Sequence, residues 1–338
     1  MEKDTKRFLL KGAEFASIFI LASILFSLYL EIFPMNYFQQ AYPIWSYQFD
    51  IIDGNIPADD ARILIFGDSR AMAGIIPEII GNDTRSLALG GATPIETYFI
   101  LQRYLQTHSA PAIILLSFAP QHLQKSFTFW DRTVKFGFFD KNSIAEIYKT
   151  AKLNKDFPME KETSFWVEYY LIKFRFLPLY APELRESIFF LEHNANKAKY
   201  DEMMHFRGHT PFGNLQMDDE TIAKSYEAEN PRFSASKTLV NYTVRIANLC
   251  KENNITIVYF TMPFSEFSFS FLNESYFKEY NTLMGQIVMA APGNSFMGKI
   301  PVYENRHFTD SSHLNGAGAV KFSNELKGIL ARQGLDPV

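Results

Sequence analysis

Short apolar runs alternate with amphipathic stretches over most of the chain after residue 61. Continuous apolar runs are typical of parallel strands that are buried on both faces, and they predict three strands, at residues 62–67, 86–89 and 111–118. Two further strands are predicted at 255–263 and 299–304. Helices are predicted between and after the strands, at 71–80, 94–106, 237–250, 276–290 and 316–331. This alternation predicts an α/β fold with a doubly wound parallel sheet.

An uncharged apolar run, residues 15–30, lies near the N-terminus. With Ile32 and Phe33 it approaches the roughly 20 residues that a helix needs to cross a bilayer. The run is apolar on all sides, whereas a helix on the surface of a soluble core carries a single apolar stripe. We therefore expect a transmembrane anchor.

Basic residues before this run set the expected orientation of the anchor. These basic residues are Lys3, Lys6, Arg7 and Lys11. Because Lys and Arg mark the cytoplasmic side of a membrane helix, the chain after the anchor is expected to be extracytoplasmic. A cleaved signal peptide is the alternative interpretation. The residues after the run, which include Glu31, Phe33 and Pro34, do not form a small-residue cleavage site, so an uncleaved anchor is favoured.

These patterns divide the chain into an anchor, a connector and one large domain. We assign residues 1–34 to the cytoplasmic N-terminus and anchor, 35–61 to the connector, and 62–338 to the domain. Residues 121–236 interrupt the strand alternation and are rich in aromatic and charged side chains, which predicts a largely helical insertion.

Composition excludes several classes of protein. Of the 338 residues 47% are hydrophobic and 21% charged, which is unlike a disordered chain. The formal net charge of −4 argues against a nucleic-acid partner, because such proteins carry a basic surplus. The single cysteine, Cys250, excludes an internal disulfide and a cysteine-based zinc site. No cofactor or metal is expected.

A small polar corner, Gly67-Asp68-Ser69-Arg70, follows the first predicted strand. Asp and Ser are common helix N-caps, so a turn that starts a helix would account for them. The alternative is a serine nucleophile, because ligand sites of doubly wound sheets lie beyond the carboxyl ends of the strands.

Near the other end of the chain, Asp310 and His313 precede the last predicted helix. Separately, Asp310 could be a helix cap and His313 a surface histidine. Together, their spacing allows the carboxylate to accept a hydrogen bond from one ring nitrogen and to leave the other free as a base. That is the arrangement of a Ser-His-Asp triad.

These segments resemble the blocks of the SGNH/GDSL hydrolase superfamily, in the same order, across about residues 62–335. The resemblance rests on Gly67-Asp68-Ser69, on Gly91 after the second strand, and on Asp310-x-x-His313. It implies a flavodoxin-like SGNH fold in which Ser69 is the nucleophile, His313 the base and Asp310 its orienting acid. It further implies an oxyanion hole made by the backbone N–H groups of Ser69 and Gly91, with Gly90 beside them.

One block departs from the superfamily pattern. The usual Gly-x-Asn-Asp after the third strand, whose Asn completes the oxyanion hole, is replaced here by Ser117-Phe118-Ala119-Pro120-Gln121-His122. Either Gln121 or His122 could supply the lost donor, or both could pack or cap the loop. Arg70, next to the proposed nucleophile, could bind an anionic substrate or anchor the loop in an ion pair.

The anchor and the missing block together resemble a membrane-bound subgroup that includes proteins of teichoic-acid D-alanylation and alginate acetylation. This resemblance implies a polytopic membrane O-acyltransferase as acyl donor and a cell-envelope or secreted glycan as acceptor. The expected function is acyl transfer, with acetyl as the expected group, through an acyl-serine. An extracytoplasmic carbohydrate esterase and a catalytically silent scaffold of an acylation complex are the alternatives.

Overall fold

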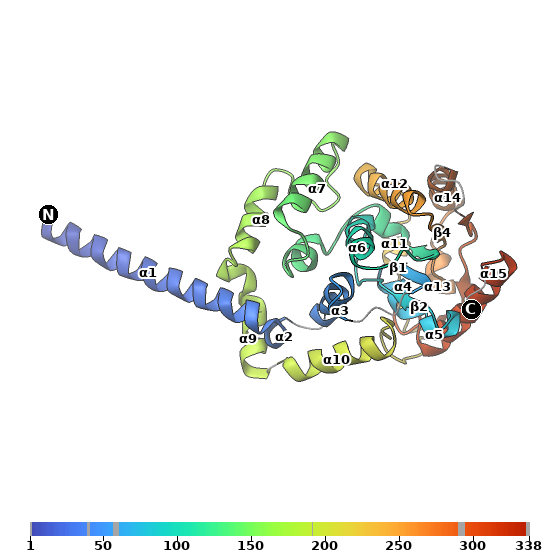
Figure 1. Cartoon of the computed structure of the whole chain (residues 1–338), viewed down its shortest axis with the longest axis horizontal. Helices are drawn as coiled ribbons and strands as arrows, with labels where there is room; N and C mark the ends of the chain where they lie inside the picture. Colours follow the sequence, from blue (N-terminus) through green and yellow to red (C-terminus); the bar gives the residue numbers. More distant parts are fainter. Residues whose placement is uncertain (1, 39–40, 57–60, 191, 290–294, 336–338) are drawn as a thin grey trace.

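The computed structural model describes residues 2–38, 41–56, 61–190, 192–289 and 295–335. An α/β body carries one long N-terminal helix, α1 (Glu2–Ile32), which projects away from it (Figure 1). A parallel sheet lies inside the body, and helices cover both of its faces. The expected α/β class with a parallel, helix-flanked sheet is confirmed.

The sheet has five strands in the order β2-β1-β3-β4-β6, and every neighbouring pair is parallel. The strands are β1 (Ile63–Gly67), β2 (Thr84–Ser86), β3 (Ile113–Ser117), β4 (Thr256–Tyr259) and β6 (Ser295–Phe296). All residues of β1 and β3 are buried, which explains their continuous apolar sequence. The chain moves from β1 to β2 on one side and later to β3 on the other, so the order of the strands reverses next to the end of β1.

Contacts between helices divide them into two layers. On one side α15 packs against α4 and α5, and on the other α12 packs against α6 and α14 (Figure 1). The first layer consists of α4 (Ser69–Gly74), α5 (Pro77–Ile80) and α15 (Gly316–Arg332). The second consists of α6 (Pro94–Thr107), α12 (Lys237–Glu252) and α14 (Glu274–Met289).

Three sequence predictions need correction. The helix expected at 71–80 starts at Ser69 and is divided into α4 and α5, because Pro77 disfavours a helical conformation at the residue before it. The second strand, expected at 86–89, is assigned to Thr84–Ser86, although Leu87 and Leu89 still donate backbone hydrogen bonds to Ile65 and Gly67.

The third correction concerns the end of the sheet. Residues 299–304 were expected to supply its fifth strand, but β7 (Val302–Tyr303) pairs with β5 (Phe264–Ser265) in a separate two-stranded sheet. The edge strand of the main sheet is β6 instead, which is too short to show a hydrophobic pattern. The predicted helix at 276–290 is present as α14, and its last residue lies outside the described residues.

Helices occupy the long segment between β3 and α12, and its described residues contain no strand. They are η1 (Pro120–Leu123), η2 (Phe129–Val134), α7 (Lys141–Asn154), α8 (Phe165–Lys173), α9 (Leu177–Phe190), α10 (His193–His205) and α11 (Tyr226–Glu229). Short elements complete the fold: α2 (Pro34–Tyr37), α13 (Glu266–Phe269) and η3 (Asn305–His307).

The stretch expected to be a connector, residues 35–61, contributes to the core. Its helix α3 (Tyr42–Ile52) packs against α6 and α10. Trp45 and Tyr47 are buried, and the Tyr47 hydroxyl accepts a hydrogen bond from Arg85 at 3.0 Å. The chain between the N-terminal helix and the sheet is therefore integral to the body.

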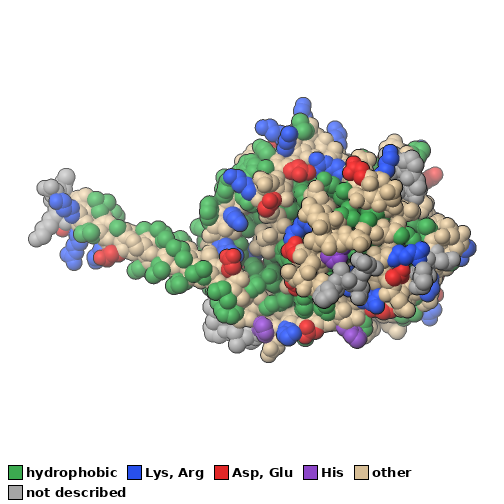
Figure 2. Space-filling model, in the orientation of Figure 1, with side chains coloured by type: hydrophobic (Ala, Val, Ile, Leu, Met, Phe, Trp, Pro, Cys, Tyr) green, Lys and Arg blue, Asp and Glu red, His purple; other side chains and the backbone are tan. Residues whose placement is uncertain are grey.

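Among the described residues, α1 is the one helix long and apolar enough to cross a membrane, with a mean hydropathy of 2.1 in an 18-residue window within Asp4–Ile32. Hydrophobic side chains cover most of it, and Lys and Arg side chains gather at its N-terminal end (Figure 2). Where it meets the body, Leu30 and the aromatic residues Tyr37, Phe38 and Tyr180 form a small separate core.

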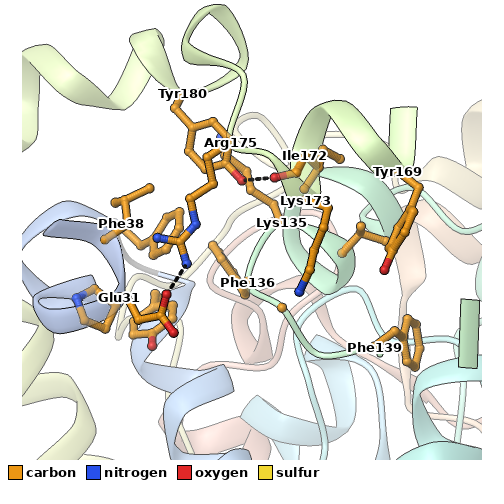
Figure 3. A pocket seen from close by; sticks show the side chains of 15 residues that line it. Glu31, Phe38, Lys135, Phe136, Phe139, Tyr169, Ile172, Lys173, Arg175 and Tyr180 are labelled. Atoms are coloured by element: carbon orange, nitrogen blue, oxygen red, sulfur yellow. Dashed lines mark hydrogen bonds and ion pairs between the residues drawn. The ribbon is translucent and has the colours of Figure 1, made fainter. Parts of the chain in front are cut away.

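A pocket of about 240 Å³ lies at this junction (Figure 3). Basic side chains of the insertion, Lys135, Lys173 and Arg175, line it together with aromatic residues. Arg175 forms an ion pair with Glu31 of α1 at 3.8 Å and donates a hydrogen bond to the carbonyl of Ser27. The end of α1 is therefore fastened to the body by both packing and polar contacts.

Candidate active site

Ser69 is the first residue of α4, directly beyond the end of β1. Asp68 caps this helix: its Oδ1 accepts a hydrogen bond from the N–H of Arg70 at 2.8 Å. Its Oδ2 accepts one from the N–H of Ala119 at 2.6 Å, which ties the corner to the loop after β3. Glycine is required at position 67, because a Cβ there would lie 2.0 Å from the carbonyl oxygen of Ser117.

His313 lies in the loop between η3 and α15 and faces Ser69. Its Nε2 is 2.8 Å from Ser69 Oγ, and its Nδ1 is 2.7 Å from Asp310 Oδ2. The other carboxylate oxygen, Asp310 Oδ1, accepts the N–H groups of Ser312 and His313, both at 2.8 Å. The structure thus brings together three side chains that are up to 244 residues apart in the sequence.

These contacts favour one assignment of protons. A carboxylate only accepts hydrogen bonds, so Nδ1 of His313 carries a proton that it donates to Asp310. Nε2 is then the acceptor for the Ser69 hydroxyl, which is the arrangement that a general base requires.

The surroundings of Asp310 keep it ionised. Burial acts to raise its pKa, but the hydrogen bond and charge of His313, together with two backbone N–H donors, hold the pKa below its ordinary value. An ionised Asp310 stabilises the positive charge that develops on His313 when it takes up a proton.

Phe212 was not among the residues expected from the sequence. Its ring stacks on that of His313, with centroids 4.0 Å apart and planes 3° from parallel. The preceding chain runs along the edge of the sheet, where Ser86 N–H donates to the carbonyl of Arg207 at 2.8 Å. Phe212 belongs to the insertion, which carries no recognisable motif, so no local signal in the sequence pointed to it.

Gly90 and Gly91 follow β2 at the same edge of the sheet as Ser69, because Leu89 still pairs with Gly67 at the end of β1. Gly91 has a φ of +80°, and a Cβ there would lie 2.6 Å from the Thr128 side chain. The Gly91 carbonyl accepts the Thr128 hydroxyl at 3.0 Å, and that of Gly90 accepts Arg132 Nη1 at 3.1 Å. The insertion therefore holds the expected oxyanion loop by its carbonyl groups.

Arg70 is buried and forms an ion pair with Glu227 of α11 at 2.7 Å. Its guanidinium also stacks on the Phe264 ring, 5.0 Å from the centroid. Of the two roles expected for Arg70, this geometry supports the anchoring ion pair. Burial acts to lower the pKa of Arg70, but the charges of Glu227 and Asp68, together with the hydrogen bond to Glu227, raise it above its ordinary value.

The segment that replaces the missing block forms the 3-10 helix η1. His122 is buried with Nε2 3.8 Å from Asp68 Oδ2, and burial lowers its pKa, so the ring is held neutral at pH 7. Its Nδ1 has no partner among the described residues. Gln121 is partly exposed. The Ala119 N–H, which is donated to Asp68, does not face the site.

In the described part of the chain, no group of three or more His, Cys, Asp or Glu side chains is placed to hold a metal ion.

Neither a family model nor a curated protein sequence matches the chain. Among solved structures, it is similar to one described as a "putative platelet activating factor" from Streptococcus pneumonia. The two chains are 12% identical, the similarity covers 92% of this chain and 98% of that one, and the TM-score is 0.42. This similarity is too distant to extend to a site or an activity.

Proposed function

We propose that the protein is a membrane-anchored, SGNH-type serine acyltransferase. It passes an acyl group, which we take to be acetyl, to a hydroxyl of a cell-envelope or secreted glycan through an acyl-serine intermediate. The observation that carries this proposal is the chain of hydrogen bonds from Ser69 Oγ to His313 Nε2, at 2.8 Å, and from His313 Nδ1 to Asp310 Oδ2, at 2.7 Å.

In the first half of the reaction, Ser69 Oγ attacks the carbonyl carbon of an ester or thioester while His313 Nε2 takes the hydroxyl proton. Asp310 stabilises the resulting imidazolium. The N–H groups of Ser69 and Gly91 stabilise the oxyanion, since neither is donated to another acceptor among the described residues. The intermediate then collapses, the leaving group takes the proton from His313, and an acyl-Ser69 remains.

In the second half, an acceptor hydroxyl loses its proton to His313 and attacks the acyl carbon. The proton then returns to Ser69 as the acyl bond to Oγ breaks, which regenerates the starting site. The acceptor leaves with the acyl group and the site returns to its starting state, so no further reactant is consumed.

The strand order supports the assignment to the SGNH type. In a doubly wound sheet, ligands bind where the strand order reverses, and Ser69 lies at that point, after β1. The catalytic blocks follow one another along this sheet as in the superfamily. The third block is the exception, and Gln121 remains a candidate for its donor because its side chain is partly exposed.

Two features support a position at the membrane. The first is α1, whose basic N-terminal end predicts a cytoplasmic N-terminus and an extracytoplasmic body. The second is a groove in which the exposed α8 residue Val167 and the exposed Phe174 after it face Phe19 and Ser23 of α1. Apolar side chains beside a membrane-spanning helix fit the lipid interface. The site would then be accessible to a polytopic acyl-donor protein.

A carbohydrate esterase is the second candidate, and the openness of the site favours it. The side chains of His313 and Asp310 are 16% and 46% exposed, so solvent water can reach this end of the triad. A silent scaffold has no comparable support, because a relic of a triad would have no reason to keep both hydrogen bonds.

The test is acylation of Ser69 in the full chain, purified in detergent. A fluorophosphonate probe and p-nitrophenyl acetate should both modify the wild type, as measured by intact mass. Ser69→Ala should not be modified, whereas Ser311→Ala, a matched change in the loop before His313, should be modified like the wild type. Absence of modification in the wild type would refute the acyl-enzyme.

Adding an oligosaccharide acceptor separates the two candidate reactions. Transfer predicts an acylated sugar and faster release of p-nitrophenol, because the acceptor speeds deacylation. If acetate is the sole product that carries the acyl group at every acceptor concentration, the protein is an esterase.

A further inference from the structure

A cavity of about 440 Å³ adjoins the candidate active site. Three of its lining residues belong to the elements that carry the site: Met72 of α4, Gly90 of the proposed oxyanion loop, and Phe212, which stacks on His313. Helix α10 contributes part of the lining. A molecule held in this cavity would therefore extend from the reacting carbonyl toward α10.

Arg132 places a cation in the lining of this cavity. It comes from η2, a single π-helical turn, which is a feature that often occurs at functional sites. Its Nη1 donates to the carbonyl of Gly90 at 3.1 Å, and among the residues that the structure describes no carboxylate forms an ion pair with it. Burial lowers the pKa of Arg132, and the neighbouring Asp131 only partly opposes this.

A partly desolvated guanidinium without a counterion is unfavourable, and an anionic ligand would relieve this. Arg70 differs in this respect, because its buried guanidinium is neutralised by Glu227. Arg132 has four further N–H donors besides the one used by Gly90, and their planar arrangement fits the oxygens of a carboxylate or a phosphate.

Other polar groups of the cavity complete an anion site. The hydroxyl of Thr210 is buried without a hydrogen-bond partner in the described structure. Lys199 of α10 also lines the cavity, and its ammonium group contacts Glu202 at 2.9 Å. Glu192 is the acidic residue in the lining. Asn196 directs its amide to the carbonyls of Met35 and Phe38.

We propose that this cavity binds a carboxylate or phosphate group of the ester substrate. Arg132 holds the charge, and Ile44, Met72 and Phe212 contact the apolar part of the same molecule. The proposal rests on the proposed function, since it assigns the substrate class of that site: an acyl ester with an anionic group on its alcohol side, or on its acyl side if the transferred group is not acetyl.

The test compares two pairs of esters, each with one anionic and one neutral member. The pair p-nitrophenyl hemiglutarate and p-nitrophenyl butyrate places the charge on the acyl side. The pair p-acetoxybenzoate and phenyl acetate places it on the alcohol side. The measured quantity is the ratio of kcat/KM for the anionic member to that for the neutral member.

Arg132→Gln should lower this ratio by about tenfold or more in one of the pairs, and that pair identifies the side that carries the charge. Arg132→Lys should restore part of the ratio, and Lys199→Gln should lower it less. Lys197→Gln is the matched control, because Lys197 is an exposed lysine of the same helix that pairs with Asp201 outside the cavity.

A purely structural role of Arg132 would lower kcat/KM of both members equally. A ratio that changes by less than about twofold in both pairs therefore overturns the proposal. Failure of the proposed function looks different: the wild type and Ser69→Ala would be equally inactive on all four esters.

Binding can be measured without turnover, so the proposal stays testable in that case. Calorimetric titration of p-acetoxybenzoate and of p-nitrophenyl hemiglutarate into the full chain in detergent should give, for one of the two esters, about tenfold weaker binding to Arg132→Gln than to Lys197→Gln. Equal affinities of these two variants for both esters would overturn the anion site, provided that both variants unfold at the temperature of the wild type.

Discussion

Replacing one member of the Arg70–Glu227 pair should strongly destabilise the protein. The two side chains are 4% and 0% exposed, and their charged atoms are 2.7 Å apart. Glu227→Ala would leave the buried Arg70 without a counterion, which costs about 3–5 kcal/mol for a buried pair. For a chain of 338 residues, a loss of that magnitude lowers the midpoint of thermal unfolding by roughly 4–7 °C.

Replacing both partners should cost much less than replacing one. Glu227 Oε1 has no hydrogen-bond partner in the described structure, so the pair is itself incompletely compensated. An apolar pair of similar volume, Arg70→Met with Glu227→Leu, removes both buried charges at once. We expect the double variant to be more stable than Glu227→Ala by about 2 kcal/mol or more.

The assay is urea unfolding of the full chain in detergent, followed by tryptophan fluorescence, with hydrolysis of a neutral ester measured alongside. A loss below about 1 kcal/mol for Glu227→Ala would show that the pair does not stabilise the fold. If Arg70→Met keeps its stability but loses affinity for anionic esters, Arg70 binds substrate and our anchoring interpretation is wrong.

Three further predictions test other parts of the structure. Gly91→Ala should slow acylation by about 10²-fold, because the new Cβ would contact Thr128 and shift the oxyanion donor. Gly137→Ala should leave the acylation rate unchanged, because Gly137 has a similar φ of +78° but open space around it. Burial lowers the pKa of His209 below 6.5, so the unfolded chain takes up a proton more readily than the folded protein, and stability should fall as the pH drops below about 6.5. The urea midpoint should therefore depend less on pH in His209→Asn than in the wild type. The emission of an environment-sensitive fluorophore attached at Phe174→Cys should shift to shorter wavelength in liposomes, whereas that of one at the similarly exposed Leu153→Cys should not. The buried Cys250 should stay unlabelled, and equal spectra of the two labelled variants would contradict the membrane contact.

Local signals in the sequence were sufficient for much of the fold. The strands β1 and β3 are continuous apolar runs because both of their faces are covered by helices. The helices α6, α12 and α15 were predicted to within about two residues because their caps and periodicity are local properties. The apolar run of α1 is equally local, and its length alone identifies a possible membrane span.

Features that depend on distant contacts were beyond the sequence. The edge strand β6 has two residues and exists because β4 offers it hydrogen bonds. The strand expected at residues 299–304 joins a different sheet, because its register is fixed by β5. Such pairings leave no periodic pattern in a short segment.

The site shows the same division. Gly67-Asp68-Ser69 and Asp310-x-x-His313 are short motifs whose spacing the sequence displays, and their order suggested that they meet. Phe212 and Arg132 contribute to the same region from an insertion without a motif, and only the packing of that insertion against the sheet brings them there. The role of Arg70 was likewise open until Glu227, 157 residues away, was placed beside it. The sequence alone determines the local chemistry and its candidates, because both depend on neighbouring residues. The tertiary structure decides which charges are neutralised and which remain free to bind a ligand, because burial and pairing depend on residues far apart in the chain.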